Sequence, residues 1–262
     1  MNLEIITNQP QTLKHPVPIL FVHGMWHAAW CWKQNFMPYF ADHGYKVYAL
    51  SLRGHGSSDE RNKLRWTSLA DYVADLVQVI DQIGQLPILV GHSMGGMVVQ
   101  KYIEKNKVPG VILLASAPPK GVIPATIRIF FRHPLAFLKV NLTLSMFPII
   151  GTPALAREAF FSSVMPEETM KNYFPQLQDE SYRVYLDILG FNLPHPKPFQ
   201  VPMLVLGASD DKIFKPKEVE ATAKAYGAQA EIFPDMAHDM MLELNWQKVA
   251  EKMLGWLEQS GL

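Results

Sequence analysis

Residues 86–96 constrain the fold of this chain more than any other stretch, because a run of β-favouring apolar residues leads directly into a glycine-rich turn. The turn reads G-x-S-x-G, with Gly91 and Gly95 on either side of Ser93, and a helix-like segment follows at residues 97–104. This order predicts a strand that turns sharply into a helix and lifts the serine hydroxyl clear of the backbone, an arrangement called a nucleophile elbow. The serine then adopts a strained left-handed conformation, and side chains in place of the two glycines would crowd the turn.

The rest of the chain alternates short β-rich runs with segments of helical period, a pattern typical of a mostly parallel sheet covered by helices. We expect strands at residues 18–23, 46–51, 86–91, 108–115, 201–208 and 229–233, with an N-terminal edge strand at 3–7. Helices are expected at residues 32–42, 68–83, 97–104, 217–226 and 246–259. In the second helix, Thr67 or Ser68 can cap the start and Gly84 ends it. The sequence therefore predicts the α/β class.

The alternation stops between Pro118 and Pro198. This segment carries several prolines and many large apolar side chains, and it lacks convincing buried strands. About 80 residues are too many for an ordinary connection, so we expect a folded, largely helical insertion. It leaves from the carboxyl end of a strand, the edge at which open parallel sheets bind ligands. We therefore divide the chain into a core of residues 1–117 and 199–262 and a cap of residues 118–198, and we expect the cap to lie over Ser93.

The balance of charge argues against a polyanionic partner. Lysine plus arginine and aspartate plus glutamate number 24 each, so the formal net charge is zero and nothing steers the protein toward nucleic acid. The single cysteine, Cys31, cannot form an internal disulfide and is expected to be buried. The N-terminus has no basic segment followed by an apolar one, and no apolar run approaches the ~18 residues that span a bilayer. We therefore expect a cytoplasmic protein without a transmembrane segment.

A serine hydroxyl becomes a strong nucleophile only when a base takes its proton and a third group orients that base. After an elbow of this kind, the acid and the histidine follow the serine in the order Ser, Asp, His. The expected strand at residues 201–208 is followed by Asp210 and Asp211, and the expected strand at 229–233 is followed by His238. Because the carboxyl ends of parallel strands meet at one edge of a sheet, we expect these side chains to approach Ser93.

With these features the chain resembles the α/β-hydrolase superfamily, in its esterase- or lipase-like branch, over nearly its whole length. The resemblance implies the α/β-hydrolase fold, with helices on both faces of a central sheet and a helical cap. It makes Ser93 the nucleophile and His238 the base. The acid in this family usually lies three residues beyond the glycine that ends its strand, which implies Asp210 rather than Asp211.

The other half of the chemistry is an oxyanion hole, in which two backbone amides face the oxygen that becomes negative. The residue after the nucleophile, Met94, supplies one amide at the N-terminus of a helix. Residues 23–25 (His-Gly-Met) resemble the family's histidine–glycine oxyanion loop, which implies the Met25 amide as the second donor. Beside this loop, Trp26 and Trp30 either line the acyl pocket as substrate-binding residues or pack the first helix.

The remaining histidines have plainer explanations. His23, His55 and His92 belong to glycine-flanked turns, where a ring usually hydrogen-bonds to the backbone. His23 and His27 are four residues apart, but without a third ligand nearby they do not predict a metal site. The sequence has no dinucleotide-binding, Walker or C-x-x-C motif, so we expect no cofactor.

The serine at the elbow narrows the chemistry. Relatives that open epoxides or remove halides carry an aspartate at that position. Relatives that cleave cyanohydrins carry a lysine directly after the catalytic histidine, where this chain has Asp239, which we expect to be a solvated loop residue. The leading hypothesis is a serine hydrolase that cleaves a carboxylic ester or thioester of a small to medium apolar substrate through an acyl-enzyme intermediate.

Other functions stay open. Perhydrolases and cofactor-free haloperoxidases use the same triad with peroxide in place of water, and C–C bond hydrolases use it as well. The scaffold also serves as a non-catalytic binding protein, although an intact Ser, Asp and His set disfavours this. Residues 127–133 mix apolar and basic groups and could touch a lipid surface. Because the basic residues are few, we favour a cap over a small-molecule substrate, and the sequence leaves the oligomeric state open.

Overall fold

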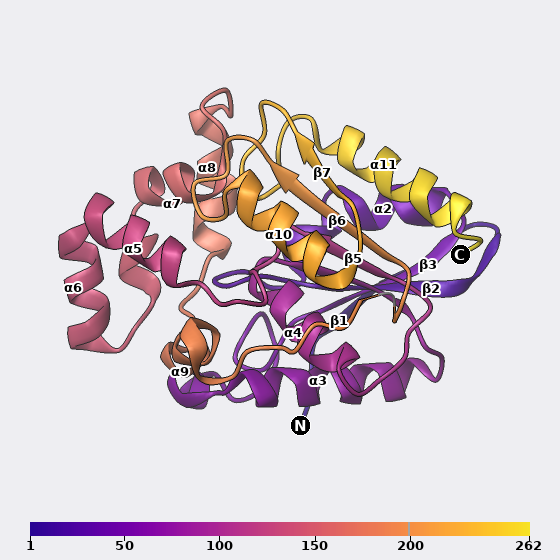
Figure 1. Cartoon of the computed structure of the whole chain (residues 1–262), viewed down its shortest axis with the longest axis horizontal. Helices are drawn as coiled ribbons and strands as arrows, with labels where there is room; N and C mark the ends of the chain where they lie inside the picture. The colour runs from indigo at the N-terminus through magenta and orange to yellow at the C-terminus, as the bar shows by residue number, and fades with distance from the viewer. Residues whose placement is uncertain (199) are drawn as a thin grey trace.

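A computed structural model describes residues 1–198 and 200–262. Within these residues, seven strands form one sheet in the order β1-β3-β2-β4-β5-β6-β7, and β1 alone runs antiparallel to its neighbour (Figure 1). The strands are β1 (Ile5–Asn8), β2 (His15–Val22), β3 (Tyr45–Leu50), β4 (Ile88–His92), β5 (Val111–Leu114), β6 (Met203–Ala208) and β7 (Ala230–Phe233). The α/β class and all seven expected strands are confirmed, with ends that differ by up to three residues.

The register of the central strands positions the site. Every residue of β4 and β5 is buried, because helices cover both faces of the parallel part of the sheet. Val22 pairs with Gly91, and His92 pairs with Leu114. The loops that follow β2, β4 and β5 therefore leave the sheet side by side at its carboxyl edge.

Helices pack on the two faces of the sheet (Figure 1). On one face, α2 (Phe36–Asp42) follows the short α1 (Trp30–Lys33) and contacts α11 (Trp246–Gln259), with the rings of Phe36 and Trp246 6.2 Å apart. On the other face, α3 (Leu69–Ile83) contacts α4 (Met94–Ile103). The third helix of that face is α10 (Pro216–Tyr226), whose Tyr226 hydroxyl donates to Gln100 of α4 at 3.2 Å.

The helices differ from expectation in two places. The helix expected at 32–42 is broken into α1 and α2, because Asn35 leaves the helical conformation and its side-chain amide donates to the carbonyl of Met241 at 2.9 Å. The helix α4 begins at Met94, directly after the turn, rather than at residue 97. In α3, Ser68 caps the start and Gly84 ends it with a left-handed φ of 72°, as expected.

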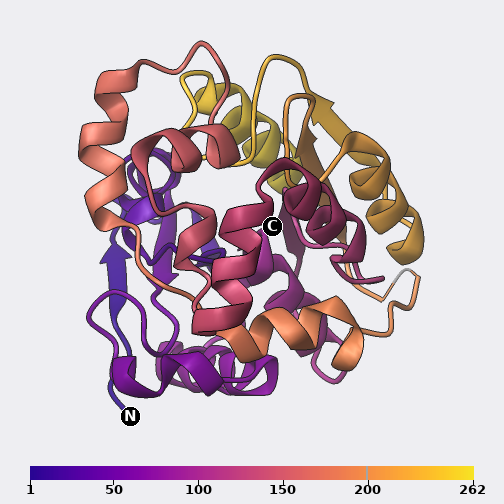
Figure 2. The ribbon, with the colours of Figure 1, turned by 90° about the vertical axis from the view of Figure 1, so that its left-hand side faces the viewer.

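Between β5 and β6 the chain forms helices only, within the described part of residues 118–198. They are α5 (Ile123–Arg132), α6 (Pro134–Thr143), η2 (Phe147–Ile149), α7 (Pro153–Phe160), α8 (Glu167–Tyr173), η3 (Phe174–Gln176), α9 (Tyr182–Leu186) and η4 (Asp187–Phe191). One further 3-10 helix, η1 (Arg61–Trp66), belongs to the loop after β3. Figure 1 shows α5, α6 and α7 at one end of the molecule, and Figure 2 views that end face on. The division into a core and a cap domain stays a prediction.

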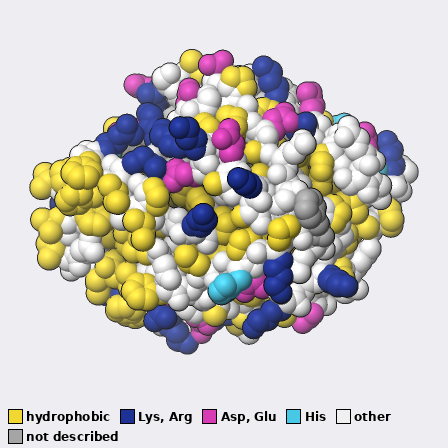
Figure 3. Space-filling view, viewed as in Figure 1, with side chains coloured by type: hydrophobic (Ala, Val, Ile, Leu, Met, Phe, Trp, Pro, Cys, Tyr) yellow, Lys and Arg dark blue, Asp and Glu magenta, His cyan; other side chains and the backbone are white. Residues whose placement is uncertain are grey.

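The surface over α5 and α6 is unusually apolar. Figure 3 shows hydrophobic side chains clustered at the end of the molecule where these two helices lie. Elsewhere the large apolar side chains are mostly buried, and Cys31 is fully buried as expected. Among residues 1–198 and 200–262, every helix is too short or too polar to cross a bilayer.

Candidate active site

Ser93 occupies the sharp turn between β4 and α4. Its φ and ψ are 52° and −120°, a strained conformation for a residue with a side chain. Backbone hydrogen bonds hold it there: the Ser93 amide donates to the carbonyl of Leu114 at 3.1 Å, and the Ser93 carbonyl accepts from Gly96 and Ala117 at 3.0 and 2.9 Å. The elbow geometry expected from the sequence is confirmed.

Both glycines of the motif are required by close contacts between backbones. A Cβ atom on Gly91 would lie 2.6 Å from the Cα of Gly96. A Cβ atom on Gly95 would lie 2.4 Å from the carbonyl oxygen of Val22. Any side chain at either position would push α4 away from the sheet and displace Ser93.

His238 lies in the loop between β7 and α11, and its partner is Asp211. The Nδ1 atom of His238 is 2.7 Å from Oδ2 of Asp211, and both side chains are buried. The other carboxylate oxygen of Asp211 accepts from the amides of Ile213 and Phe214 at 2.7 and 3.0 Å. Burial alone would lower the pKa of His238, but the Asp211 carboxylate outweighs it and raises that pKa.

The preference for Asp210 is corrected by this geometry. Asp210 is exposed, and its carboxylate accepts from the neighbouring Ser209 hydroxyl at 2.9 Å rather than from His238. Its amide donates to the carbonyl of Met236 at 2.9 Å, which fixes the turn so that the next residue points inward. The carboxylate that pairs with His238 thus lies four residues beyond Gly207, one more than the spacing implied by the resemblance.

A hydrogen bond from His92 connects the loop that carries His238 to the turn at Ser93. Its Nε2 atom is 3.0 Å from the carbonyl oxygen of His238, which places His238 next to the residue that precedes Ser93. Burial lowers the pKa of His92 to about 3, so the ring is neutral and Nε2 carries the proton that it donates. The backbone-bonding role expected for His92 is the one found.

The two residues whose backbone amides are predicted to form the oxyanion hole lie near Ser93. Met25 and Met94 line the same cavity as Ser93. Within the described residues, neither of their amides donates a hydrogen bond to another protein group. The Met94 amide is at the N-terminus of the ten-residue helix α4, where the helix dipole favours negative charge.

A buried ion pair that sequence reasoning missed joins the two loops of the site. Nε2 of His27 is 2.8 Å from Oδ2 of Asp239, and its Nδ1 is 2.8 Å from the carbonyl oxygen of Met25. Both ring nitrogens of His27 therefore face oxygen atoms that can accept a hydrogen bond. Burial alone would raise the pKa of the Asp239 carboxyl. Its contact with His27, together with the nearby rings of His92 and His238, outweighs burial and lowers that pKa. The expectation that Asp239 is solvated is wrong, since its side chain is fully buried.

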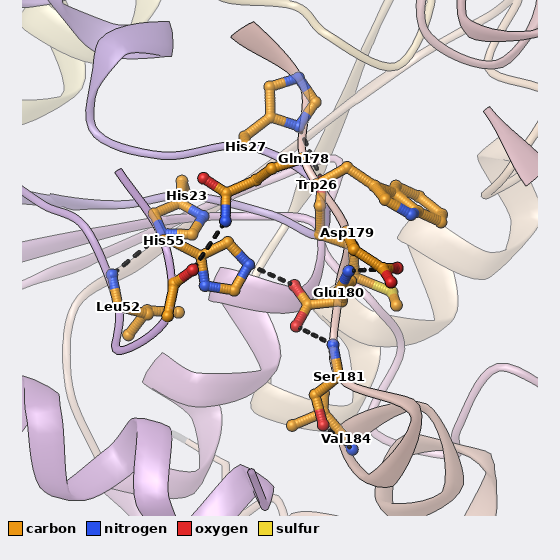
Figure 4. A network of polar contacts seen from close by, with 12 residues as sticks. His23, Trp26, His27, Leu52, His55, Gln178, Asp179, Glu180, Ser181 and Val184 are labelled. Carbon is orange, nitrogen blue, oxygen red and sulfur yellow. Dashed lines mark hydrogen bonds and ion pairs between the residues drawn. The ribbon is translucent and has the colours of Figure 1, made fainter. Parts of the chain in front are cut away.

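His23 and His55 have structural partners. His23 donates through Nδ1 to the carbonyl of Gly24 at 2.8 Å and accepts through Nε2 from the amide of Leu52 at 3.1 Å (Figure 4). Burial lowers the pKa of His23, in keeping with this neutral ring. His55 lies 3.2 Å from the buried carboxylate of Glu180, which belongs to the cap segment.

The cap is fastened to the core at this place (Figure 4). The amide of Gln178 donates to the carbonyl of Trp26 at 3.0 Å, and its side chain bonds to the backbone of Gly54 and Gly56 at 2.8 and 2.9 Å. The indole of Trp26 donates to the carbonyl of Met146 at 3.2 Å. Trp26 therefore links the oxyanion loop to the cap through both its backbone and its side chain.

An apolar cavity lies between Ser93 and the cap. It holds about 970 Å³ of empty space, including its open mouth. Its floor includes Met25 and Trp26, and cap residues such as Ile129 and Phe137 line its other side. Three charged residues, Arg132, Glu158 and Lys212, and one histidine, His133, also border it.

The two tryptophans proposed for substrate binding lie in different places. Trp26 lines the cavity and is buried against Phe160, with ring centroids 5.8 Å apart. Trp30 is not among the cavity residues. Its ring stacks on His27 at 5.4 Å and lies 6.0 Å from that of Tyr173. Trp30 thus packs the outer side of the His27 ion pair.

His92, His238 and Asp239 form a cluster in which metal-ligating atoms lie within 4.8 Å of one another. Each side chain already has a protein partner: the carbonyl of His238 for His92, Asp211 for His238, and His27 for Asp239.

Curated relatives share parts of this sequence. A non-heme chloroperoxidase of Streptomyces lividans is 36% identical over 107 residues, which cover 39% of this chain and 38% of that protein. Salicylic acid-binding protein 2 of Nicotiana tabacum is 32% identical over 114 residues, or 42% of this chain and 43% of that protein. These matches span less than half of each relative. A non-heme haloperoxidase of Rhodococcus erythropolis is 23% identical over 265 residues, with 92% of both chains covered.

Solved structures share the fold over nearly the whole chain. A putative non-heme bromoperoxidase from Mycobacterium tuberculosis has a TM-score of 0.79 at 20% identity, covering 99% of this chain and 97% of that one. An esterase from Exiguobacterium antarcticum has a TM-score of 0.73 at 18% identity, covering 98% and 95%. At such identities the likeness concerns the fold. A family model described as "Alpha/beta hydrolase family" matches residues 19–252, and the chain belongs to this family.

Proposed function

We propose that this protein is a serine hydrolase that cleaves a carboxylic ester or thioester of an apolar substrate. The observation that carries the proposal is the buried His238–Asp211 pair, held at 2.7 Å in a loop that is bonded to the residue before Ser93. A histidine oriented by a carboxylate beside an elbow serine is the arrangement that activates a hydroxyl for acyl transfer.

In the proposed mechanism, Ser93 Oγ attacks the substrate carbonyl carbon while Nε2 of His238 takes its proton. Asp211 orients the ring and stabilises the imidazolium. The amides of Met25 and Met94 donate to the oxyanion, each contributing roughly 3–4 kcal/mol to the stability of the transition state. The alcohol or thiol leaves with the proton from His238, and a water deprotonated by His238 then releases the acid and restores Ser93.

The substrate class follows from the cavity. Its surface is almost entirely apolar, and it is roomy enough for an acyl chain of several carbons. The charged residues at its border include the Arg132–Glu158 ion pair at 3.5 Å. We therefore propose a small to medium apolar acyl group as the substrate portion bound between Ser93 and the cap.

A second candidate is suggested by the names of two relatives, the non-heme chloroperoxidase and the non-heme haloperoxidase. Hydrogen peroxide would then replace water in the last step, so that the acyl-enzyme yields a peracid and free Ser93. The same residues would serve both reactions, and peracid formation from acetate and peroxide separates this candidate from plain hydrolysis.

The experiment that tests the proposal is labelling of the folded protein with a fluorophosphonate, followed by assays on p-nitrophenyl esters from acetate to octanoate. We expect stoichiometric labelling that is absent in Ser93→Ala, together with hydrolysis of the esters. Absence of labelling in a folded wild-type protein would contradict a serine nucleophile. Labelling without hydrolysis, but with peracid formation, would favour the second candidate.

A further inference from the structure

The hairpin formed by α5 and α6, residues 123–143, is apolar on two opposite sides. On α5, the cavity is lined by Ala125 and Ile129, four residues apart on one face. The opposite face carries Ile123, Ile127 and Phe131, also at helical spacing, with exposures of 52%, 50% and 77%. A helix with one core-facing stripe would be polar on its outer face.

The second helix repeats the pattern. Phe137 and Val140 line the cavity, whereas Leu135, Leu138 and Leu142 point outward with exposures of 75%, 53% and 75%. Although α6 also carries the polar residues Lys139, Asn141 and Thr143, it has apolar side chains on two faces, and a helix face of this kind is normally covered. The outer face of α6 is therefore the kind of surface that a partner covers.

The exposed side chains form one surface rather than scattered positions. Seven of the fifteen large apolar side chains exposed among the described residues lie between positions 123 and 142. Phe130 connects the two helices, since its ring lies 5.2 Å from that of Phe131 and 5.4 Å from that of Phe137. Figure 3 shows this apolar surface at the cap end of the molecule. Contiguous apolar surfaces of this kind mark sites of interaction with proteins or membranes.

The charge around this surface distinguishes the candidate partners. The whole chain is formally neutral, yet residues 118–166 contain five basic residues and a single acidic one, Glu158. Glu158 is engaged by Arg132 and His133 at 3.5 and 3.4 Å. The charged residues of the hairpin itself are Arg128, Arg132 and Lys139, all basic, and Arg128 turns toward the core, where it pairs with Glu218 at 2.6 Å. A second copy placed on this face by two-fold symmetry would bring the same basic residues together, which disfavours it.

We propose that the outer face of α5 and α6 docks the protein onto an anionic lipid surface. The apolar side chains enter the boundary between headgroups and acyl chains, and the two exposed basic residues, Arg132 and Lys139, lie at the level of anionic headgroups. Docking through this face places the cavity one helix diameter, about 10 Å, from the lipid. An apolar molecule dissolved in the lipid then has a short path to the cavity, whatever chemistry takes place there.

The test is co-sedimentation of the full-length protein with vesicles of phosphatidylcholine, with and without phosphatidylglycerol. We expect binding to the anionic vesicles that weakens at high salt, because screening removes the electrostatic part. The triple variant Phe131→Ser, Leu135→Ser and Leu142→Ser should lower the partition coefficient at least about tenfold. These three side chains are exposed and lie outside the cavity lining, so hydrolysis of a soluble short ester should be unchanged.

A matched control replaces three exposed leucines outside the cap with serine: Leu13→Ser, Leu86→Ser and Leu244→Ser. Their exposures are 60%, 48% and 53%. It should bind vesicles within about twofold of wild type, as expected for area that stays outside the lipid. Lys139→Glu tests the electrostatic part in a protein with an intact apolar face, and it should weaken binding to anionic vesicles severalfold.

Equal sedimentation of wild type and triple variant would overturn the proposal, as would absence of wild-type binding to anionic vesicles. A dimer in light scattering that the triple variant dissociates would assign the face to a second copy instead. If the triple variant failed to fold, unchanged binding of Lys139→Glu would still contradict the proposal.

Discussion

The carboxyl edge of the sheet and the cap that covers it are built by opposite rules. At the sheet edge, buried histidines and carboxylates are held by specific partners, such as His238 by Asp211 and His27 by Asp239, at 2.7 and 2.8 Å. In the cap, α5 and α6 present apolar side chains to the cavity and to the solvent alike. This difference indicates that the proposed chemistry depends on a few polar atoms with specific partners. The proposed substrate preference depends instead on the volume of the apolar cavity. Four predictions test that contrast.

The largest effect is expected at the sheet edge, from Ser93→Ala. Removing the proposed nucleophile should lower kcat on the order of 10⁴-fold or more. Stability should change little, because the hydroxyl faces the cavity and makes no hydrogen bond within the described residues. Steady-state rates and thermal unfolding of both proteins check this, and a variant that kept a tenth of the wild-type rate would rule out covalent catalysis by Ser93.

The same substitution at two adjacent aspartates of one loop, Asp210 and Asp211, should have very different effects. Asp211→Asn should lower kcat/KM by about 10⁴-fold, since the amide disfavours the tautomer of His238 that can accept a proton from serine. Asp210→Asn changes an exposed carboxylate and should cost less than about tenfold. Similar losses in the two variants, measured on one soluble ester, would place the orienting acid elsewhere.

In the cap, the volume of a side chain that lines the cavity should determine which esters are preferred. Ile129→Trp fills part of the cavity and should lower the preference for octanoate over acetate esters at least about tenfold, because each lost methylene contact weakens binding. Acetate turnover should fall by no more than about threefold. The control is Ile127→Trp, two positions along the same helix on its exposed face, which should leave the ratio unchanged. If both variants behaved alike, the cavity would not be the acyl site.

The smallest effect is expected where the cap contacts the core, at His55 and Glu180. It is an effect on stability that depends on pH. Burial alone would lower the pKa of His55, but Glu180 raises it, with Arg61 opposing. His55 then contributes stability that is fully present below its unfolded pKa of about 6.5 and is lost as pH rises through the higher folded pKa. Glu180→Gln can keep the hydrogen bonds from Tyr72 and Ser181 while removing the charge.

The free energy of unfolding of wild type should therefore exceed that of Glu180→Gln by about 1 kcal/mol near pH 6, and the gap should shrink toward pH 9. Denaturant titrations across this range provide the measurement. If this difference grew with pH, the contribution of His55 to stability would have the opposite sign to the one assigned. The His55–Glu180 pair would then not stabilise the attachment of the cap.

Much of the fold could be predicted because its signals are local. Alternating runs gave the strands, and the spacing of Gly91, Ser93 and Gly95 gave the elbow. The place of a site residue could be predicted where it depends on its own loop, as for Met94, which lines the cavity beside Ser93. It was missed where the role depends on a partner far away in the chain, as for His27 and Asp239, which are 212 residues apart.

The choice between Asp210 and Asp211 failed for a related reason. Two adjacent aspartates look equivalent in a sequence, and the backbone bond from Asp210 to Met236 decides which of them faces His238. That bond joins two loops whose relative position only the folded sheet defines. The two-sided apolar character of α5 was visible as a mixed apolar and basic segment, but its exposed face could not be assigned before the cavity was located.

The double attachment of Trp26 links the position of the cap to that of the loop that carries Met25. The cap cannot lift away from the sheet without breaking the bonds from Gln178 to the Trp26 carbonyl and from the Trp26 indole to Met146. The same residue follows Met25, whose amide is the proposed oxyanion donor. A substitution that weakened either bond would therefore act at two places at once, on the closure of the cavity and on the alignment of the proposed donor.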